Sequence, residues 1–369
     1  MASDSSLSHD DASNSNASYI STVNAQKHIE KEEKSSKKKA IKLGIKIAKF
    51  IVFILIVVWI ARQLQKSWTE IVQYEWNPRF GWLIFSGLLY LLAFLPTASF
   101  WFFSLRWLGQ EPNYWKAIKA FYFSQLGKYI PGKAMVVLIR SDMISGPKVR
   151  MSIAAVSVFY ETLTMMGSGA FIAACIVLCY FREHLLFSCM ALAVAIVSLV
   201  PLVPPVFVRI LKILRIGKND PLVQESLKKL KYSSLLKGFL LMTVTWLFFG
   251  LSLWAAILGL GITPHPLSIA LPRYVAVVAL AMTLGFAVPI SPGGLGIREA
   301  VLSALLLPYF DIILKEPSNL TWTVAPEAVA TIVSLVQRIT SILAEVGLVI
   351  CLFLGSFIIK YLIRKKEER

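Results

Sequence analysis

Three long stretches of this chain contain no Asp, Glu, Lys or Arg, and they constrain the fold more than any other feature. They are residues 81–105, 185–208 and 238–271, each at least 24 residues long. A helix needs roughly 20 apolar residues to cross the hydrocarbon core of a bilayer. The chain is therefore predicted to be an all-α polytopic membrane protein, and its mean hydropathy of +0.66 agrees with this class.

The N-terminal 40 residues differ in kind from the rest of the chain. They are rich in Ser, Asn and Asp, they end in a basic run, and they offer little apolar surface to bury. We predict a disordered tail over residues 1–40 and a single integral membrane domain over 41–369. The first apolar stretch is predicted to be a signal anchor rather than a cleaved signal peptide, because it begins late and lacks a small-residue cleavage site.

Six segments are predicted to span the membrane: roughly 43–62, 81–105, 152–180, 185–208, 238–260 and 327–359. Two further apolar stretches, 116–140 and 268–307, are interrupted by Pro and Gly, and we predict that each forms a re-entrant helical hairpin. The segments over 81–180 and 238–359 then share the order span, hairpin, span, with opposite orientations in the membrane. Such an inverted repeat, with broken helices near the midplane, is typical of transporters.

The net charge of +17 is distributed in a way that indicates a membrane protein with a preferred orientation. With both termini in the cytosol, 30 of the 38 Lys and Arg residues fall on the cytosolic side and six outside. This asymmetry follows the positive-inside rule. We therefore expect a multi-pass protein of the cytoplasmic (inner) membrane that does not bind nucleic acid.

The motif "PISPGGLGIRE" (289–299), within the second broken stretch, is the leading candidate for a binding site. Proline ends a helix, whereas glycine permits positive φ and close backbone approach. A new helix is predicted to begin near Ile297, with its positive dipole end and Arg298 available to an anion. The alternative is a tight turn in which Arg298 and Glu299 balance each other. The candidate binding residues here are Ser291, Pro292, Gly293, Gly294, Gly296, Arg298 and Glu299.

The motif "GKYIPGK" (127–133), within the first broken stretch, repeats this pattern on the cytosolic side. The alternative is that its basic and aromatic residues only anchor the chain at the membrane interface. Its candidate residues are Lys128, Tyr129, Pro131, Gly132 and Lys133. Two intramembrane charges, Glu161 and Arg338, complete the candidate binding set, because such residues usually face the protein interior or a wet cavity. We expect Glu161 to pair with Arg298 or Arg338 or to remain protonated; a purely structural ion-pair network is the alternative.

The sequence contains no recognisable catalytic constellation, metal site or cofactor motif. The four cysteines lie in apolar segments without CxxC spacing, and the four histidines lie in the tail and in short loops. We therefore expect no metal, no cofactor and no enzymatic centre.

The two motifs, together with a Glu in the span after the first and an Arg in the last span, resemble the lysylphosphatidylglycerol synthase transmembrane-region family. The resemblance covers about residues 45–360. It implies a lipid translocase fold, with aminoacylated phosphatidylglycerol or a polyprenyl-phosphate-linked lipid as substrate. Bifunctional members add a soluble aminoacyl-transferase domain, whereas only about ten residues follow the last span here.

The function expected from these features is translocation of an anionic lipid, without enzymatic chemistry. A membrane-embedded glycosyl or lipid transferase is one alternative, and an accessory subunit of a lipid-modifying enzyme is another. The expected partners are anionic membrane lipids, with a lipid-modifying enzyme or a second copy of the chain as further candidates.

Cysteine labelling tests the orientation. In a cysteine-free background, a cysteine at Lys315 should react with an impermeant reagent on intact cells, whereas one at Lys228 should react only after permeabilisation. External labelling at Lys228 would contradict the six-span topology and the inverted repeat.

Overall fold

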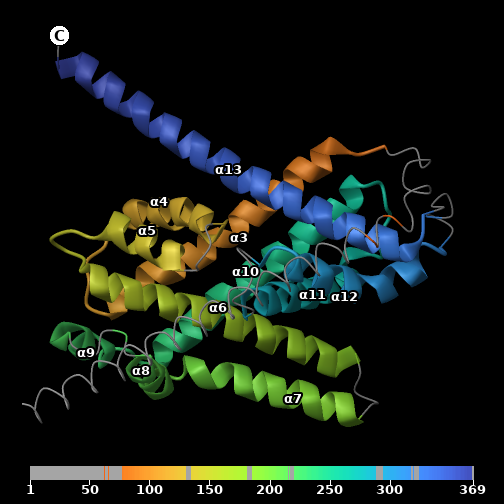
Figure 1. The fold of residues 1–369 in the computed structure, drawn as a ribbon, viewed down its shortest axis with the longest axis horizontal. Helices are drawn as coiled ribbons and strands as arrows, with labels where there is room; N and C mark the ends of the chain where they lie inside the picture. The colour runs from red at the N-terminus through yellow and green to blue at the C-terminus, as the bar shows by residue number, and fades with distance from the viewer. Residues whose placement is uncertain are drawn as a thin grey trace, which may run out of the picture. The chain divides into compact units, whose positions relative to one another are not determined.

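The computed structural model describes the chain from residue 77 to residue 367, apart from short gaps, and positions 62 and 65. The described ranges are 77–129, 134–180, 185–214, 216, 220–287, 294–316, 319 and 324–367. All of these positions belong to one compact unit, residues 56–369. Helices make up nearly all of the described structure, and within it the isolated bridge between Gly146 and Val149 is the one β-type pairing (Figure 1). The all-α prediction is confirmed. The predicted tail and first span, 1–40 and 43–62, lie outside the described residues apart from position 62.

Five helices of the described structure are long and apolar enough to cross a membrane. They are α3 (Phe80–Trp107), α6 (Met151–Tyr180), α10 (Tyr232–Gly259), α11 (Leu267–Ala287) and α13 (Pro326–Glu367). Four of these coincide with predicted spans, since only α11 was assigned to a hairpin. The chain is a multi-pass membrane protein.

The predicted span over 185–208 is bent by 73° in the structure. It consists of α7 (Leu185–Leu199), the 3-10 turn η2 (Val200–Leu202) and α8 (Pro204–Ile213). Pro201, Pro204 and Pro205 explain the bend, since proline removes a backbone donor and its ring clashes with the preceding turn. The two pieces amount to a sixth span only if they cross together. The short helix α9 (Pro221–Leu227) follows, capped by the Asp220 side chain.

The first broken stretch contains α4 (Tyr114–Gln125), the 3-10 turn η1 (Leu126–Tyr129) and α5 (Ala134–Ile144). Helices α4 and α5 pack against each other. At 12 and 11 residues, each is about 16–18 Å long, roughly half of a hydrocarbon core. A paired hairpin of this size fits the predicted re-entrant form, although residues 130–133 at its tip lie outside the described structure.

The second broken stretch is less symmetrical than predicted. Helix α11 has 21 residues and passes the length and composition test for a span, whereas α12 (Ile297–Ile313) has 17. The first arm is thus longer than a re-entrant hairpin requires. Residues 288–293 between the arms lie outside the described structure. The re-entrant placement and the inverted repeat stay predictions.

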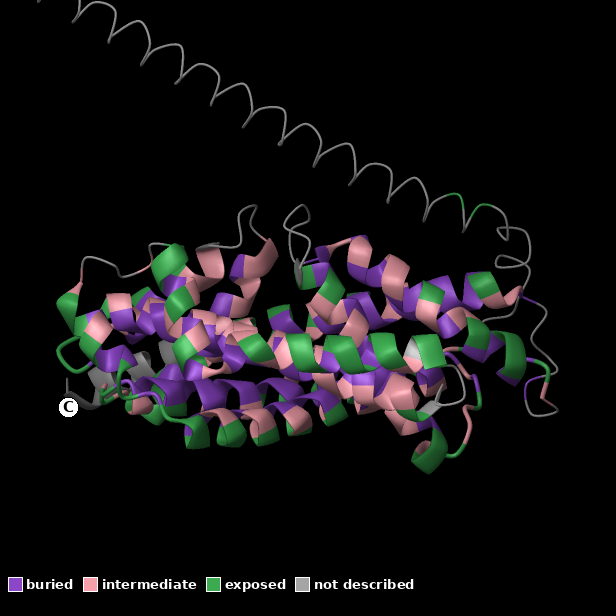
Figure 2. Cartoon of the chain, turned by 90° about the horizontal axis from the view of Figure 1, so that it is seen from below, coloured by how far each residue is buried: buried purple, intermediate pink, exposed green. Residues whose placement is uncertain are grey.

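An antiparallel pair, α3 and α10, forms the centre of the described fold. Small residues let the two helices approach: the Ser86 hydroxyl donates to the Ser252 carbonyl at 2.7 Å, and the Thr97 and Thr245 hydroxyls lie 2.9 Å apart. Close packing and interhelical hydrogen bonds of this kind hold helices together where lipid removes the hydrophobic driving force. On the opposite side of α3, large apolar side chains such as Leu88 are exposed, as expected of a lipid-facing surface; Figure 2 shows buried and exposed residues on different sides of several helices.

Gly250 of α10 offers a test of the packing of α10 against α11. A Cβ atom there would lie 2.5 Å from Val275 Cγ2 and 3.1 Å from the Val275 backbone nitrogen on α11. Gly250→Ala should therefore destabilise the protein by about 1–3 kcal/mol through overpacking. Gly347, within α13, has nothing within 4 Å of the corresponding position, so Gly347→Ala should be neutral or slightly stabilising. Equal thermal unfolding midpoints of the two variants in detergent would contradict this packing.

Candidate functional site

A cluster of charged and aromatic side chains gathers around Glu345 of α13. Glu345 is 3% exposed. Its carboxylate accepts hydrogen bonds from Tyr90 Oη at 2.7 Å and from Tyr129 Oη at 2.9 Å, and it forms an ion pair with Lys128. A buried carboxylate is tolerated when its lone pairs are occupied in this way. Glu345 thus connects η1 of the first broken stretch to α3 and α13.

Lys128 lies among aromatic rings as well as beside Glu345. Its Nζ is 5.2 Å from the centroid of the Tyr129 ring, 5.7 Å from that of Phe94 and 6.0 Å from that of Tyr90. These distances are within the range of cation–π attraction. The Lys128 ammonium is therefore held by a carboxylate and by aromatic faces at once.

The second broken stretch has the backbone that its glycines predict. Gly294 has φ of +74° and Gly296 of +83°, and α12 begins at Ile297. These predictions are confirmed. A Cβ atom on Gly294 would come within 3.2 Å of the Gly285 carbonyl oxygen, so this position requires glycine for space as well as for conformation.

Glu299 caps the N-terminus of α12 and links this helix to α13. Its Oε2 accepts a hydrogen bond from the Gly296 backbone nitrogen at 2.6 Å, and its Oε1 lies 3.3 Å from Arg338 Nε. The alternative of a local Arg298–Glu299 pair is therefore wrong, because the Glu299 carboxylate is engaged elsewhere. Fewer free backbone N–H groups remain at the start of α12 than predicted, since the Gly296 N–H donates to Glu299.

Arg298 is the least compensated charge of the cluster. It is 6% exposed, and a Cβ atom added at Gly285 of α11 would lie 3.1 Å from the Arg298 Cβ atom. Among the described residues, no side chain forms a hydrogen bond or an ion pair with its guanidinium. Its charge nevertheless acts on Tyr90, Lys128 and Tyr129. Arg298 therefore lies within electrostatic reach of the groups around Glu345.

Arg338 joins the two halves of the cluster. Its guanidinium lies 5.5 Å from the centroid of the Tyr129 ring and beside the Glu299 carboxylate. Among the described residues, the cluster contains three cations and two carboxylates, a formal charge of +1. These five residues are Lys128, Arg298, Arg338, Glu299 and Glu345. A buried surplus of positive charge is costly unless an anion accompanies it, so the arrangement is suited to binding an anionic group.

Glu161 lies outside this cluster. It pairs with Arg140 of α5 at 2.6 Å, and both side chains are buried. Arg140 also donates to Ser124 Oγ at 2.9 Å and lies 4.1 Å from the centroid of the Phe121 ring. The predicted pairing of Glu161 with Arg298 or Arg338 is wrong, because the packing of α5 on α6 places a different arginine beside it.

Several candidate residues cannot be placed in this geometry. Pro131, Gly132, Lys133, Ser291, Pro292 and Gly293 lie outside the described residues. Sequence reasoning missed Tyr90 and Arg140, although a tyrosine within an uncharged span was a usable signal. Within the described residues, no group of three His, Cys, Asp or Glu side chains could hold a metal ion.

A family model described as "Lysylphosphatidylglycerol synthase TM region" matches residues 46–312, more than half of the chain. The match includes Tyr90, Lys128 and Arg298, whereas Arg338 and Glu345 on α13 lie beyond it. No curated protein matches the chain.

The Arg140–Glu161 pair provides a test that separates structure from function. Glu161→Gln should lower stability by about 3–5 kcal/mol, because it leaves the Arg140 charge buried without a counterion. The double variant Arg140→Met/Glu161→Met should recover most of that loss, since it removes both charges at similar volume. Thermal unfolding midpoints of both variants check this; a double variant no more stable than Glu161→Gln would argue against a structural pair.

Proposed function

Because the chain belongs to the lysylphosphatidylglycerol synthase TM region family, we propose that it is a translocase that moves an anionic lipid between the leaflets of the cytoplasmic membrane. The family is a membrane family named for an enzyme of lipid synthesis, which supports a lipid-related function. Aminoacyl-phospholipids and polyprenyl-phosphate-linked lipids are the substrate classes that we propose, because each presents a phosphate group to the protein.

The observation that carries the proposal is the net positive charge of the buried cluster. Arg298 contributes a charge that forms no ion pair with any described residue. A lipid phosphate has the charge and the acceptor oxygens that a guanidinium binds best, often through two parallel hydrogen bonds. Both broken stretches contribute side chains to the cluster, Tyr129 from η1 and Glu299 from α12. Transporters with broken helices bind their substrates beside such breaks, which supports a role of the cluster in moving a headgroup.

The two carboxylates hold two of the three cations. Glu345 pairs with Lys128, and Glu299 pairs with Arg338. A phosphate would therefore meet Arg298 as the cation without a carboxylate partner, while the other two cations keep theirs. Such an arrangement limits the free energy lost in moving a charged headgroup through a poorly hydrated space.

A membrane-embedded transferase is the competing proposal, and an accessory subunit is a further one. A transferase requires a carboxylate that can act on the reacting group. The buried carboxylates of the cluster, Glu299 and Glu345, and Glu161 are all engaged by cations, which favours translocation. Purified protein that exchanges labelled lipid between leaflets without a partner would exclude the accessory role, and metal-dependent product formation would establish the transferase.

Arg298 is the residue whose replacement tests the translocase most directly. A charge-assisted contact to phosphate is worth roughly 1.5–3 kcal/mol, and about 1.4 kcal/mol corresponds to a factor of ten. Arg298→Ala should therefore slow leaflet exchange of a labelled anionic lipid in proteoliposomes by about tenfold or more. Arg298→Lys should retain part of the rate, because it keeps the charge and loses the planar fork.

Arg209→Ala is the matched control, since this arginine is exposed on α8. It should exchange lipid at the wild-type rate. Folded Arg298→Ala protein with that same rate would contradict the proposal that Arg298 binds the transported headgroup.

A further inference from the structure

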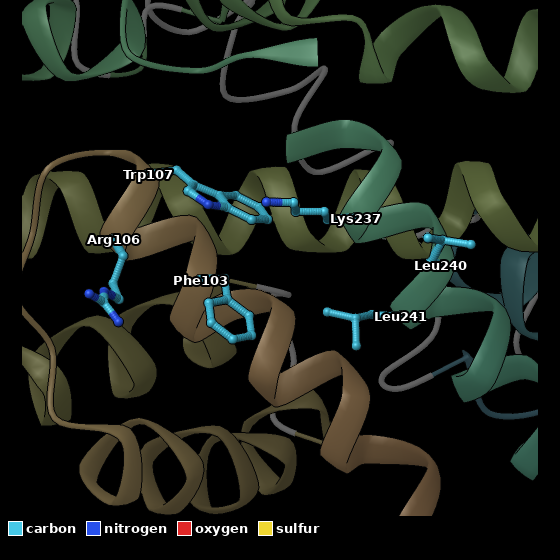
Figure 3. Close-up of a pocket in the computed structure, with 6 residues that line it drawn as sticks. All are labelled: Phe103, Arg106, Trp107, Lys237, Leu240 and Leu241. Atoms are coloured by element: carbon cyan, nitrogen blue, oxygen red, sulfur yellow. The ribbon is translucent and has the colours of Figure 1, made fainter. Parts of the chain in front are cut away.

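A separate cavity lies between the C-terminal end of α3 and the N-terminal part of α10. Its volume is about 690 Å³, and Figure 3 shows the residues that line it. They are Phe103, Arg106, Trp107, Lys237, Leu240 and Leu241. Arg106 follows Tyr90 of the central cluster by 16 residues on the same helix, a separation of about 24 Å along the helix axis. The cavity is thus distinct from the cluster.

The cavity lies beside a close contact of α3 with α10. At Gly238 the two helices approach closely, because a Cβ atom there would lie 2.3 Å from the Phe100 ring. Large side chains of both helices line the neighbouring space: Phe103 and Trp107 of α3, whose ring centroids lie 6.1 Å apart, and Leu240 and Leu241 of α10.

The cavity lies near the ends of two helices that pass the test for membrane spans, which places it near the membrane–water boundary. Tryptophan and basic residues are the side chains that favour this depth. Its lining is amphipathic: Phe103 and Leu240 are exposed apolar residues, whereas Arg106 and Lys237 are exposed cations. Figure 3 shows Phe103 and Leu241 on either side of the space, with Lys237 directed toward Trp107.

The electrostatics of the lining are one-sided. It contains two cations and no acidic residue. Within the described structure, neither Arg106 nor Lys237 forms a salt bridge, and the cation–π contact of Arg106 with Phe102, at 5.8 Å, leaves its charge available to an anion. Cations that only anchor a helix would not require an apolar cavity beside them.

We propose that this cavity binds one anionic glycerophospholipid. Arg106 and Lys237 hold the phosphate, Trp107 lies at the level of the glycerol, and the first part of one acyl chain follows Phe103, Leu240 and Leu241. The volume is within the roughly 300–1,000 Å³ usual for ligand sites. The lipid bridges α3 and α10 and so stabilises the central helix pair. This role does not depend on the translocase proposal.

The test compares lipid-dependent stabilisation of the purified full chain in detergent. Phosphatidylglycerol and phosphatidylcholine with identical acyl chains are titrated while the thermal unfolding midpoint is measured. Phosphatidylglycerol should raise the midpoint of the wild type, with little effect of phosphatidylcholine. Arg106→Gln/Lys237→Gln should need about tenfold more phosphatidylglycerol or more for the same rise, because each basic residue contributes appreciably to binding anionic lipid.

A control with the same net charge is Lys119→Gln/Lys231→Gln, which removes two exposed cations outside the cavity lining. It should respond to phosphatidylglycerol as the wild type does. Leu240→Trp keeps both cations and fills the apolar part of the cavity, so it should also lose most of the response. Equal responses of the two double variants would overturn the proposal. Inorganic phosphate that raises the midpoint as much as phosphatidylglycerol would also overturn it, in favour of a soluble anion.

Discussion

The cluster around α13 depends on one constraint: a charge buried in a membrane protein must have a compensating partner. Arg338 and Glu345 lie seven residues apart, two turns along the same face of that helix. Each contacts side chains of a different broken stretch. Glu345 contacts Lys128 and Tyr129 of the first, and Arg338 contacts Glu299 of the second. Compensation therefore determines which face of α13 is turned inward and brings two distant parts of the chain together.

The two buried ion-pair systems differ in balance rather than in burial. Arg140 and Glu161 neutralise each other, and Ser124 and the Phe121 ring occupy the remaining surface of the arginine. Nothing in that pair attracts a further ion. The cluster around Glu345 has one cation more than it has carboxylates, and this surplus makes it a candidate for binding an anion whereas the other pair stabilises the packing of α5 on α6.

The central helix pair relates the fold to both proposed lipid sites. Small residues such as Ser86 and Gly238 bring α3 and α10 together, which holds Tyr90 in position beside Glu345. Larger residues at the end of α3 line the cavity near Trp107. One helix thus takes part in a buried polar site in its middle and an amphipathic site at its end.

The sequence by itself determined the features that local chemistry decides. Long apolar stretches located α3, α6, α10 and α13, and the glycines predicted positive φ at positions 294 and 296 and a helix from Ile297. The bend at Pro201 was readable from the same kind of signal, because proline acts on its own turn. Only the tertiary structure decided the partners: Glu161 with Arg140, Glu299 with Arg338, and Tyr90 with Glu345. These pairings depend on which helices pack together and on their rotation about their axes, and no local pattern in the chain records either.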